Sequence, residues 1–385
     1  MKVAVYVPHG AVPDRRGFAP AIVAWNFARR LRFASPVVIS AAEDCSALRE
    51  DIAGIPVFRL RQGKLYTRLF TKLTRLDPWP LDRRACALAN KIAPDIFHAH
   101  QLEFPVARFR AGLRKRLPII VHAHVTNRNF DPANGVADRY VAVSGYVRTM
   151  LVERGYPEAA VEVVPNGADT ALFAPAAEEE KCRLRAILNI PADARVLAFV
   201  GRKQEIKGFL VFLQVAEQLL ARFDDLHVIV VGGEPRDARS EASYSQRQAA
   251  RRRLSEHPRY LELPPLPHTG LADIFRIADV CLLPSRTETQ GMVMLEAMSS
   301  GCVTVSSRVG GIPESITHGK TGFLTERRDD AEEALHLSQQ ALENFSFLEN
   351  LRAAARADMV ERFDWASVSA RLEQLYYSLH EGPAR

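Results

Sequence analysis

Long apolar runs, paired cysteines and low-complexity tails are all missing from this sequence of 385 residues. No apolar run reaches the roughly 18 residues of a membrane span, and the opening stretch MKVAVYVPHG is too short for a signal peptide. No CxxC motif or Cys/His ligand spacing links the five cysteines, which argues against a disulfide framework or a structural zinc site. We therefore expect a cytosolic protein with reduced, mostly buried thiols.

Two nucleotide-related signatures are also missing. The GxGxxG fingerprint does not follow the first predicted strand, KVAVYVP, which argues against a dehydrogenase. The basic residues are not interleaved with an aromatic platform or a reading helix, so we expect no nucleic-acid partner.

The sequence does contain an excess of positive charge. The formal net charge is +6 and the pI is about 9.1, and residues 59–84 alternate basic and apolar side chains. The basic members are Arg59, Arg61, Lys64, Arg68, Lys72 and Arg75. This basic amphipathic pattern is typical of docking on an anionic membrane surface or a phosphorylated glycolipid. A solvated helix face would explain it equally well.

The order of the predicted elements indicates two domains. Strand-like runs alternate with helical patterns from KVAVYVP to RYVAVS, pause near an Asn-Gly turn, and resume at ARVLAFVGR. We therefore predict an α/β fold with two doubly wound, Rossmann-like domains, 1–175 and 176–363, and a cleft between them. The amphipathic helix at 364–382 is expected to pack back on the first domain.

The segment TETQGMVMLEAMSSG places charged and small residues where a buried strand gives way to a helix. If the helix begins near Gly291, the free N–H groups of Gly291, Met292 and Val293 can bind phosphate oxygens. Carboxylates repel phosphate, so Glu288 before the helix and Glu296 within it are predicted to bind hydroxyl groups instead. For Glu296 alone, a solvent-facing position is the simpler interpretation.

Other loops are predicted to reach the same edge of the second sheet. Arg202 follows a strand directly after Gly201, and Lys207 precedes a helix, so the two cations could hold a diphosphate beside the helix terminus. Two pairs of glycines, Gly232–Gly233 and Gly310–Gly311, also provide loops where a ligand can approach the backbone.

At these positions the sequence resembles the retaining, nucleotide-sugar-dependent glycosyltransferases with the GT-B fold. The motifs that carry the resemblance are VPNGAD, VGRKQEIKG, VVGGEP, ADVCLLPSRTETQGMVMLEAMSSG and GGIPESITHGKTGFL, in that order. Nearly the whole chain is covered, and the match is strongest over residues 160–325. The resemblance departs from the family where Thr289 and Gln290 stand in place of a frequent Gly-Phe.

The resemblance implies a role for each matched residue. Arg202 and Lys207 would stabilise the leaving diphosphate, Gly201, Gly233 and the start of the helix at Gly291 would bind the donor, and Glu296 would hold the ribose. Catalytic roles would fall to His124, Glu288, Arg202 and Lys207, with Glu288 and His124 at the transferred sugar. The first loop, with His9, Gly10 and Gly17, would lie near donor and acceptor. His98, His100 and His122 are interpreted as hydrogen-bonded structural histidines.

The implied function is transfer of a hexose from a nucleoside-diphosphate sugar, such as a UDP-sugar, to a hydroxyl of a glycan or glycolipid. Bacterial surface polysaccharide or lipopolysaccharide biosynthesis is the expected pathway, at a cytoplasmic location or on the inner face of the plasma membrane. No metal or other cofactor is expected, since no DxD motif accompanies the predicted cleft segments. A sugar-nucleotide epimerase of the same fold and a non-catalytic nucleotide-sugar-binding protein are the alternatives.

Overall fold

The computed structural model describes residues 1–13, 18–42, 47–61, 66, 69–70, 77, 79–125, 129–235, 238–343 and 345–381. The chain divides into two compact units. The first contains Met1–Asn166 and Trp365–Arg385, and the second contains Gly167–Asp364. Within the described ranges, no helix is both long enough and apolar enough to cross a membrane.

The division after Asn166 precedes the boundary that the sequence predicts after residue 175. The intervening segment is bonded into the second unit. The backbone N–H of Ala168 donates to the carbonyl of Phe363 over 2.8 Å, and Phe173 is buried in the second core. Backbone pairing and apolar burial thus place the boundary earlier than the Pro/Ala-rich composition indicates.

The first unit is built on an eight-stranded sheet. In spatial order its strands are β3 (Arg49–Ile52), β4 (Ile55–Leu60), β2 (Ser35–Ala41), β1 (Lys2–Val7), β5 (Ile96–Ala99), β6 (Ile119–Ala123), β7 (Arg139–Ala142) and β8 (Val161–Val163). All neighbours are parallel except β3, which pairs antiparallel with β4. The order reverses between β1 and β5, which makes this a doubly wound sheet.

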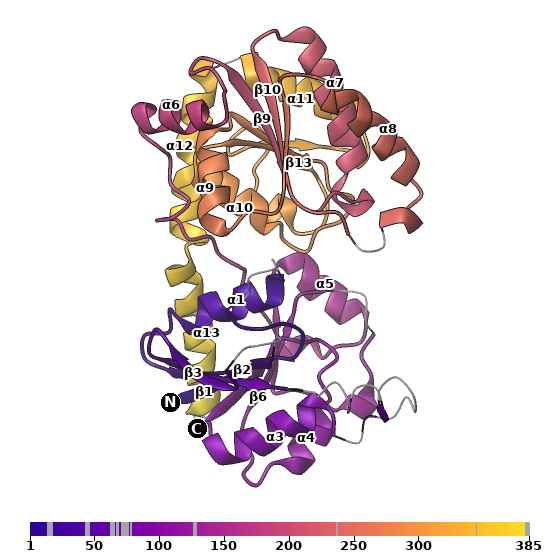
Figure 1. Ribbon diagram of the computed structural model, residues 1–385. Helices are drawn as coiled ribbons and strands as arrows, with labels where there is room; N and C mark the ends of the chain where they lie inside the picture. Colours follow the sequence, from indigo (N-terminus) through magenta and orange to yellow (C-terminus); the bar gives the residue numbers. More distant parts are fainter. Residues whose placement is uncertain are drawn as a thin grey trace. The chain divides into compact units, whose positions relative to one another are not determined.

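Helices cover both faces of the first sheet (Figure 1). They are α1 (Ala19–Ala28), α3 (Leu81–Ile92), α4 (Val106–Gly112), α5 (Gly145–Glu153) and α13 (Trp365–His380). Alternating strand residues such as Tyr6 and Phe97 pack with α3 and α4. The residues between them point to the opposite face, where Phe27 of α1 contacts Trp365 of α13, with ring centroids 5.2 Å apart.

The second unit contains a six-stranded, wholly parallel sheet. Its strands, in spatial order, are β11 (Tyr260–Leu263), β10 (Leu226–Val231), β9 (Arg195–Val200), β12 (Val280–Leu283), β13 (Val303–Ser307) and β14 (Phe323–Thr325). In chain order this is 3-2-1-4-5-6, the arrangement of Rossmann-type sheets. The two expected Rossmann-like α/β units are therefore confirmed.

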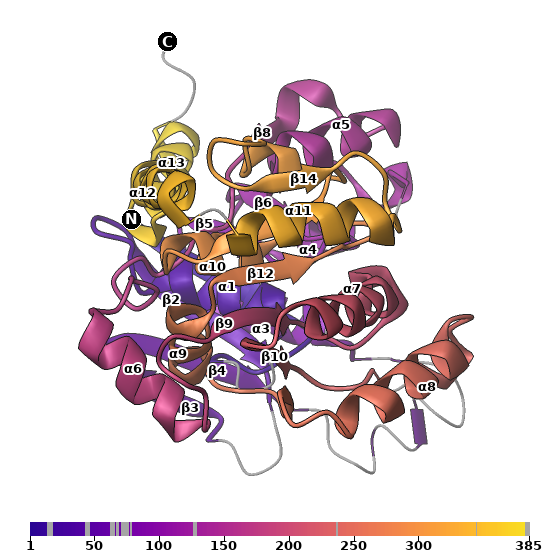
Figure 2. The ribbon, with the colours of Figure 1, turned by 90° about the horizontal axis from the view of Figure 1, so that it is seen from above.

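The helices of the second unit lie on both faces of its sheet (Figures 1 and 2). They are α6 (Glu178–Ile187), α7 (Phe209–Arg222), α8 (Tyr244–Ser255), α9 (His268–Ile277), α10 (Met292–Ser299), α11 (Ala331–Glu343) and α12 (Phe345–Arg362). Helices α7 and α11 contact each other over one face, and α10 contacts both α9 and α12. The strands are buried on both sides, which explains their nearly continuous apolar sequences.

Helix α13 is fixed to the first unit by a buried carboxylate. Glu373 is 4% exposed, and its oxygens accept backbone N–H groups of Arg32, Phe33 and Ala34 over 3.2, 2.7 and 2.7 Å. These three N–H groups lie in the segment directly before β2. A charged acceptor shared by three donors gives stronger bonds than a neutral amide would.

We predict that Glu373→Gln lowers the free energy of unfolding of the first unit by about 1–3 kcal/mol, because the amide turns an N–H group toward backbone donors. All three tryptophans, Trp25, Trp79 and Trp365, lie in this unit, so urea unfolding followed by tryptophan fluorescence reports on it. The exposed Glu381→Gln serves as the control. Equal midpoints for the two variants would contradict the prediction.

Candidate functional site

Two loops of the second unit meet where the strand order reverses, between β9 and β12. These strands are paired, with Ala198 opposite Cys281. The segment after β9 carries Arg202 and Lys207, and the segment after β12 carries Glu288. Ligands of open α/β sheets bind at this topological switch point, beyond the carboxyl ends of the strands.

Close backbone packing holds the two loops together. Gly208 has φ +67°, and a Cβ added to it would lie 1.8 Å from the carbonyl oxygen of Pro284, so only glycine fits there. The backbone N–H of Arg286 donates to Ile206 over 2.9 Å, and the Arg286 guanidinium pairs with Glu205. The segment around Lys207 is therefore fixed against the segment that leads to Glu288.

The ammonium group of Lys207 forms an ion pair with the carboxylate of Glu288. Both side chains are largely buried, with exposed fractions of 21% and 13%. The sequence predicts separate roles for these residues, at the diphosphate and at the sugar. The structure brings them into direct contact, so one residue neutralises the other.

The loop that follows β13 packs against the backbone of Glu288. The N–H of Gly311 donates to the Glu288 carbonyl over 3.2 Å. Gly310 has φ +56°, and a Cβ added there would lie 1.7 Å from the same oxygen. The sequence predicts a ligand contact for this glycine pair, whereas the structure packs it on the backbone of Glu288.

The helix predicted near Gly291 begins there. Gly291 is the N-cap of α10, and Met292 and Val293 form its first turn. A Cβ on Gly291 would lie 3.3 Å from Cγ of Glu288, so the helix terminus is next to the Lys207–Glu288 ion pair. The free N–H groups of the first turn and the ammonium group therefore offer neighbouring partners for an anion.

Glu296 is buried, with an exposed fraction of 5%, which excludes the solvent-facing interpretation. Its carboxylate lies 3.5 Å from Nε2 of His268, at the start of α9. Sequence reasoning missed His268. Its position directly after the β11 loop, at the same sheet edge, is the signal that could have identified it.

Neighbouring cations in the β9 loop have different surroundings. Arg202 is exposed, and its guanidinium has no ion-pair or hydrogen-bond partner in the described part of the chain. Lys203 is buried and pairs with Glu262, while its backbone N–H donates to Gly233 over 3.0 Å. Of these two cations, Arg202, directly after Gly201, is the one that remains available to a ligand.

The first unit contains a stack of four histidines. His98 and His100 come from β5 and its end, and His122 and His124 come from β6 and its end. Ring centroids of neighbouring members lie 4.5–5.3 Å apart. Burial lowers the pKa of all four, to about 3 for His98 and His124. The imidazoles are therefore neutral at physiological pH.

The expectation that the three inner histidines are hydrogen-bonded is only partly correct. Nδ1 of His98 bonds to the hydroxyl of Tyr376 over 2.7 Å, but neither ring nitrogen of His122 has a hydrogen-bond partner among the residues that the structure describes. Nitrogen atoms of His98, His100 and His122 lie within 4.8 Å of one another. His122 is stacked on both His98 and His100, whereas the His98 and His100 rings are tilted by 34° to each other.

His124 is held by its neighbour in the stack. Nε2 of His124 and Nδ1 of His100 are 3.1 Å apart and share one hydrogen bond. Nδ1 of His124 has no partner among the described residues. Nε2 is occupied and Nδ1 is not, and the shared hydrogen bond couples the tautomers of His124 and His100.

The first loop is described only in part. His9 is exposed directly after β1 and is followed by Gly10, whereas Gly17 lies outside the described residues. His9 and Gly10 thus lie at the switch point of the first sheet, between β1 and β5.

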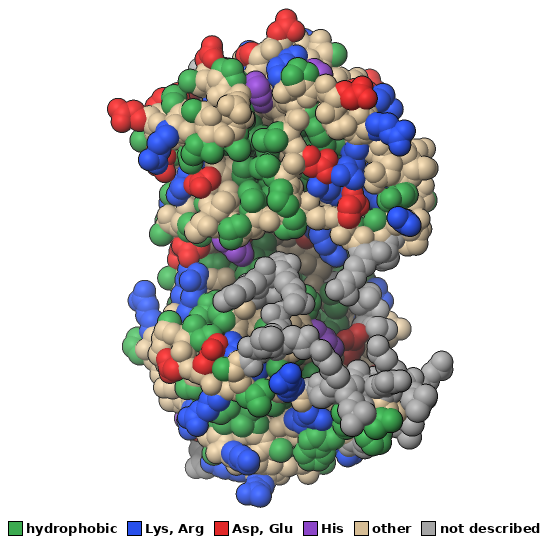
Figure 3. Space-filling view, in the orientation of Figure 1, with side chains coloured by type: hydrophobic (Ala, Val, Ile, Leu, Met, Phe, Trp, Pro, Cys, Tyr) green, Lys and Arg blue, Asp and Glu red, His purple; other side chains and the backbone are tan. Residues whose placement is uncertain are grey.

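The basic pattern at 59–84 needs one correction. Arg59 is 8% exposed; it pairs with Glu50 and donates to the carbonyls of Ala47 and Val12 over 3.0 Å each. It is therefore a structural residue of β4 and not part of a basic surface. Lys64, Arg68, Lys72 and Arg75 lie outside the described residues. Among the atoms coloured by type in Figure 3, acidic and basic side chains are mixed on the second unit, whereas basic side chains predominate along the lower edge of the first unit.

We predict that His124→Asn retains more transferase activity than His124→Gln. The Asn amide places a polar atom near the position of Nδ1, whereas the Gln amide reaches the position of Nε2, which faces His100. Turnover and donor KM are measured for both variants. Activity that survives in His124→Gln and is lost in His124→Asn would show that Nε2 is the functional atom.

The histidine stack also predicts acid sensitivity. The unfolded chain binds protons at these residues as the pH falls through about 6.5, whereas the folded chain does not, so stability is lost on acidification. In His122→Phe the stability lost between pH 7.5 and 5.0 should be smaller by roughly 2 kcal/mol, because one such group is removed. Urea unfolding followed by tryptophan fluorescence measures it, with the exposed His380→Gln as control. If His122→Phe loses as much stability between pH 7.5 and 5.0 as the unaltered chain does, His122 is not the source of the acid sensitivity.

Comparison with known proteins gives the family of each unit. Residues 20–172 match the family described as Glycosyltransferase Family 4, and residues 180–358 match Glycosyl transferases group 1. Together these ranges cover most of both units.

Curated relatives agree with this result. A D-inositol 3-phosphate glycosyltransferase of Corynebacterium urealyticum is 33% identical over 241 residues, which are 60% of this chain and 56% of the relative. The chain thus spans about half the length of the inositol-phosphate enzymes that it matches. A lipopolysaccharide 1,2-N-acetylglucosaminetransferase of Salmonella typhimurium is 26% identical and covers 81% of each chain.

Solved structures show the same fold. Sucrose-phosphate synthase of Thermosynechococcus elongatus aligns with a TM-score of 0.81 at 20% identity, over 99% of both chains. HepE of Anabaena, solved with UDP and glucose, aligns with a TM-score of 0.77 at 20% identity, over 97% of this chain and 99% of HepE. The chain therefore has the GT-B fold and carries a Glycosyltransferase Family 4 domain followed by a Glycosyl transferases group 1 domain.

Proposed function

We propose that the protein transfers a sugar from a nucleoside-diphosphate sugar to a hydroxyl group of a glycan or glycolipid, with retention of anomeric configuration. The observation that carries this proposal is the Lys207–Glu288 ion pair beside the N-terminus of α10, at the switch point of the second sheet. It places a cation, free N–H groups and a carboxylate within reach of one extended polar ligand.

The diphosphate is assigned to the positive groups of this site. Arg202 is exposed and unpaired within the described chain, and Lys207 has further N–H donors beyond the one that faces Glu288. The first turn of α10, at Met292 and Val293, adds backbone donors. Groups fixed in advance around the departing phosphate stabilise the charge that develops on it.

The hydroxyl groups of the donor are assigned to the carboxylates. Glu288 lies before α10 and faces the transferred sugar, while Glu296 lies one to two turns inside the helix and binds the ribose. The proximity of His268 to Glu296 supports a nucleoside position there. Nδ1 of His124, at the edge of the first sheet, contacts the sugar ring near its reacting carbon.

In the proposed reaction the bond between the anomeric carbon and the diphosphate oxygen breaks, and a bond from the acceptor oxygen to that carbon forms. The acceptor attacks the face that the diphosphate leaves, and its proton passes to the departing phosphate oxygen. Lys207 and Arg202 carry out the charge neutralisation for which other transferases use a divalent cation, so no metal is required in this scheme.

The substrate class is proposed from similar proteins. HepE has been solved with UDP-glucose, which supports a UDP-sugar as the donor. The relative from Salmonella typhimurium is named for lipopolysaccharide, which supports a cell-surface glycan as the acceptor. A cytoplasmic enzyme on the inner face of the membrane would meet both substrates. Leu69, Phe70 and Trp79, which are exposed apolar residues of the 59–84 segment, support contact with that surface.

We predict that Lys207→Ala lowers turnover by at least about 100-fold and weakens binding of UDP, because the ammonium group that faces the diphosphate is lost. Lys320→Ala, an exposed lysine of the same unit, is the matched control. Release of UDP from UDP-glucose is measured with acceptor glycans, and calorimetry measures UDP binding. Wild-type turnover in a folded Lys207→Ala variant would refute the phosphate role.

Product analysis tests the whole proposal. With donor alone, a transferase leaves the sugar configuration unchanged, whereas an epimerase alters it and a binding protein leaves the donor intact even when an acceptor is present. Formation of a new glycoside only when donor and acceptor are both present supports the proposal. An epimerised donor would exclude it.

A further inference from the structure

A separate cavity of about 500 Å³ lies in the first unit. Its walls come from the loop after β5, the start of α4, residues 129–135, β7 and the segment after α5. Phe104 and Tyr140 belong to the core on the α3 and α4 side of the sheet, whereas the alternating strand position of His122 places the histidine stack on the other face. The cavity therefore lies apart from His124, and neither the proposed transfer nor the compared families assign it a role.

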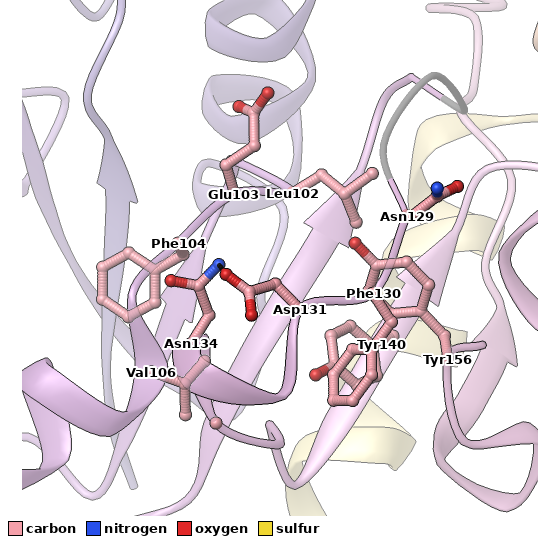
Figure 4. Close-up of a pocket in the computed structure, with 11 residues that line it drawn as sticks. Leu102, Glu103, Phe104, Val106, Asn129, Phe130, Asp131, Asn134, Tyr140 and Tyr156 are labelled. Carbon is pink, nitrogen blue, oxygen red and sulfur yellow. Dashed lines mark hydrogen bonds between the residues drawn. The ribbon is translucent and has the colours of Figure 1, made fainter. Parts of the chain in front are cut away.

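Aromatic rings form much of this cavity (Figure 4). Tyr156 contacts Tyr140 and Phe130 edge to face, with ring centroids 5.0 and 5.3 Å apart. Phe104 lies on the opposite side of the cavity in this view. Phe104, Tyr140 and Tyr156 are buried, while Phe130 is half-buried. Of these four rings, the half-buried Phe130 is therefore the one that offers an apolar face to a ligand.

Polar groups lie between the rings and toward solvent. Asp131 accepts the backbone N–H of Ala133 over 3.0 Å and the side-chain amide of Asn134 over 3.3 Å. These bonds fix both side chains in place. The side-chain oxygen of Asn134 accepts no hydrogen bond from the described residues, and the carboxylate of Asp131 retains further lone pairs. The rim thus presents fixed acceptors for hydroxyl groups.

The charge of the lining selects the kind of ligand. It includes the carboxylates of Glu103 and Asp131, and none of its described members is Lys, Arg or His. The guanidinium of Arg154 lies beside this lining and donates to the side-chain oxygen of Asn129 over 3.2 Å, so charges of both signs surround the cavity. A neutral ring with an apolar face and several hydroxyl groups matches aromatic walls combined with fixed acceptors, and the volume falls within the range of about 300–1,000 Å³ that is usual for small-molecule sites.

We propose that this cavity is a carbohydrate-binding site that takes a neutral pyranose ring, separate from the site of transfer. One ring face packs on Phe130, and hydroxyl groups donate to Asp131 and Asn134. A sugar residue at some distance from the reacting hydroxyl, on the same glycan chain, is the class of ligand that would occupy it. The link to that glycan depends on the proposed function, whereas binding of the sugar ring does not.

Direct binding to the full chain tests the proposal. Methyl α-D-glucopyranoside and methyl β-D-galactopyranoside are titrated by calorimetry and by saturation-transfer NMR, with choline chloride and inorganic pyrophosphate as charged probes. A pyranoside is expected to bind with a dissociation constant on the order of 1 mM. Phe130→Ala and Asn134→Ala should each weaken it by at least about fivefold. Phe33→Ala, which alters a phenylalanine that is 71% exposed elsewhere in the unit, should leave it unchanged.

Each outcome decides the matter. Pyranoside binding that is weakened by both cavity variants and not by Phe33→Ala supports the site. Three results would overturn it: no binding of either pyranoside, binding in Phe130→Ala and Asn134→Ala as tight as in the unaltered chain, or tighter binding of choline or pyrophosphate than of the pyranosides. UDP binding, measured on the same samples, tests the donor site alone, so failure of the proposed function is distinguished from failure of this inference.

Discussion

A lysine and a glutamate in contact at one corner of the second sheet determine what this site can bind. A carboxylate beside a helix N-terminus and a phosphate would ordinarily repel the phosphate, and a half-buried charge without a partner costs several kcal/mol. The ion pair with Lys207 offsets both effects for Glu288, the repulsion of a phosphate and the cost of burying an unpaired charge. The pair exists because the glycine and arginine contacts described above hold the β9 and β12 loops together. The site is therefore a product of backbone packing as much as of charged side chains.

Much of this arrangement could be predicted from the sequence. The alternation of apolar strands and helices indicates two parallel sheets, and the start of α10 at Gly291 follows from the glycine that precedes an apolar helical pattern. The contact of Lys207 with Glu288 could not be predicted, because 81 residues separate the two partners and only the strand order brings them together. For Glu296, the helix turn seen alone favours a solvent-facing position, because it does not reveal which neighbour covers the side chain; only the other motifs indicate a site residue.

The first unit shows the same limit. Histidines at alternate positions, His98 with His100 and His122 with His124, must share a face within each strand, and this much is visible in the sequence. The adjacency of β5 and β6, which makes four stacked rings out of two pairs, belongs to the topology. For Arg59 the sequence pattern predicts an exposed side chain, whereas the structure shows a buried one. It fits a basic surface pattern, but a strand and its edge partner β3 enclose it.

The route of the chain between the two units bears on how the protein is made. The second unit is one continuous segment, Gly167–Asp364, whereas the first needs both ends of the polypeptide. During synthesis the second unit can complete its core as soon as its own residues have emerged. The first unit, although translated earlier, lacks α13 and the carboxylate of Glu373 until the last helix leaves the ribosome. Residues 1–166 are thus completed after the second unit that follows them, and the apolar side chains that pack on Trp365, Phe27 among them, stay uncovered until α13 has been translated.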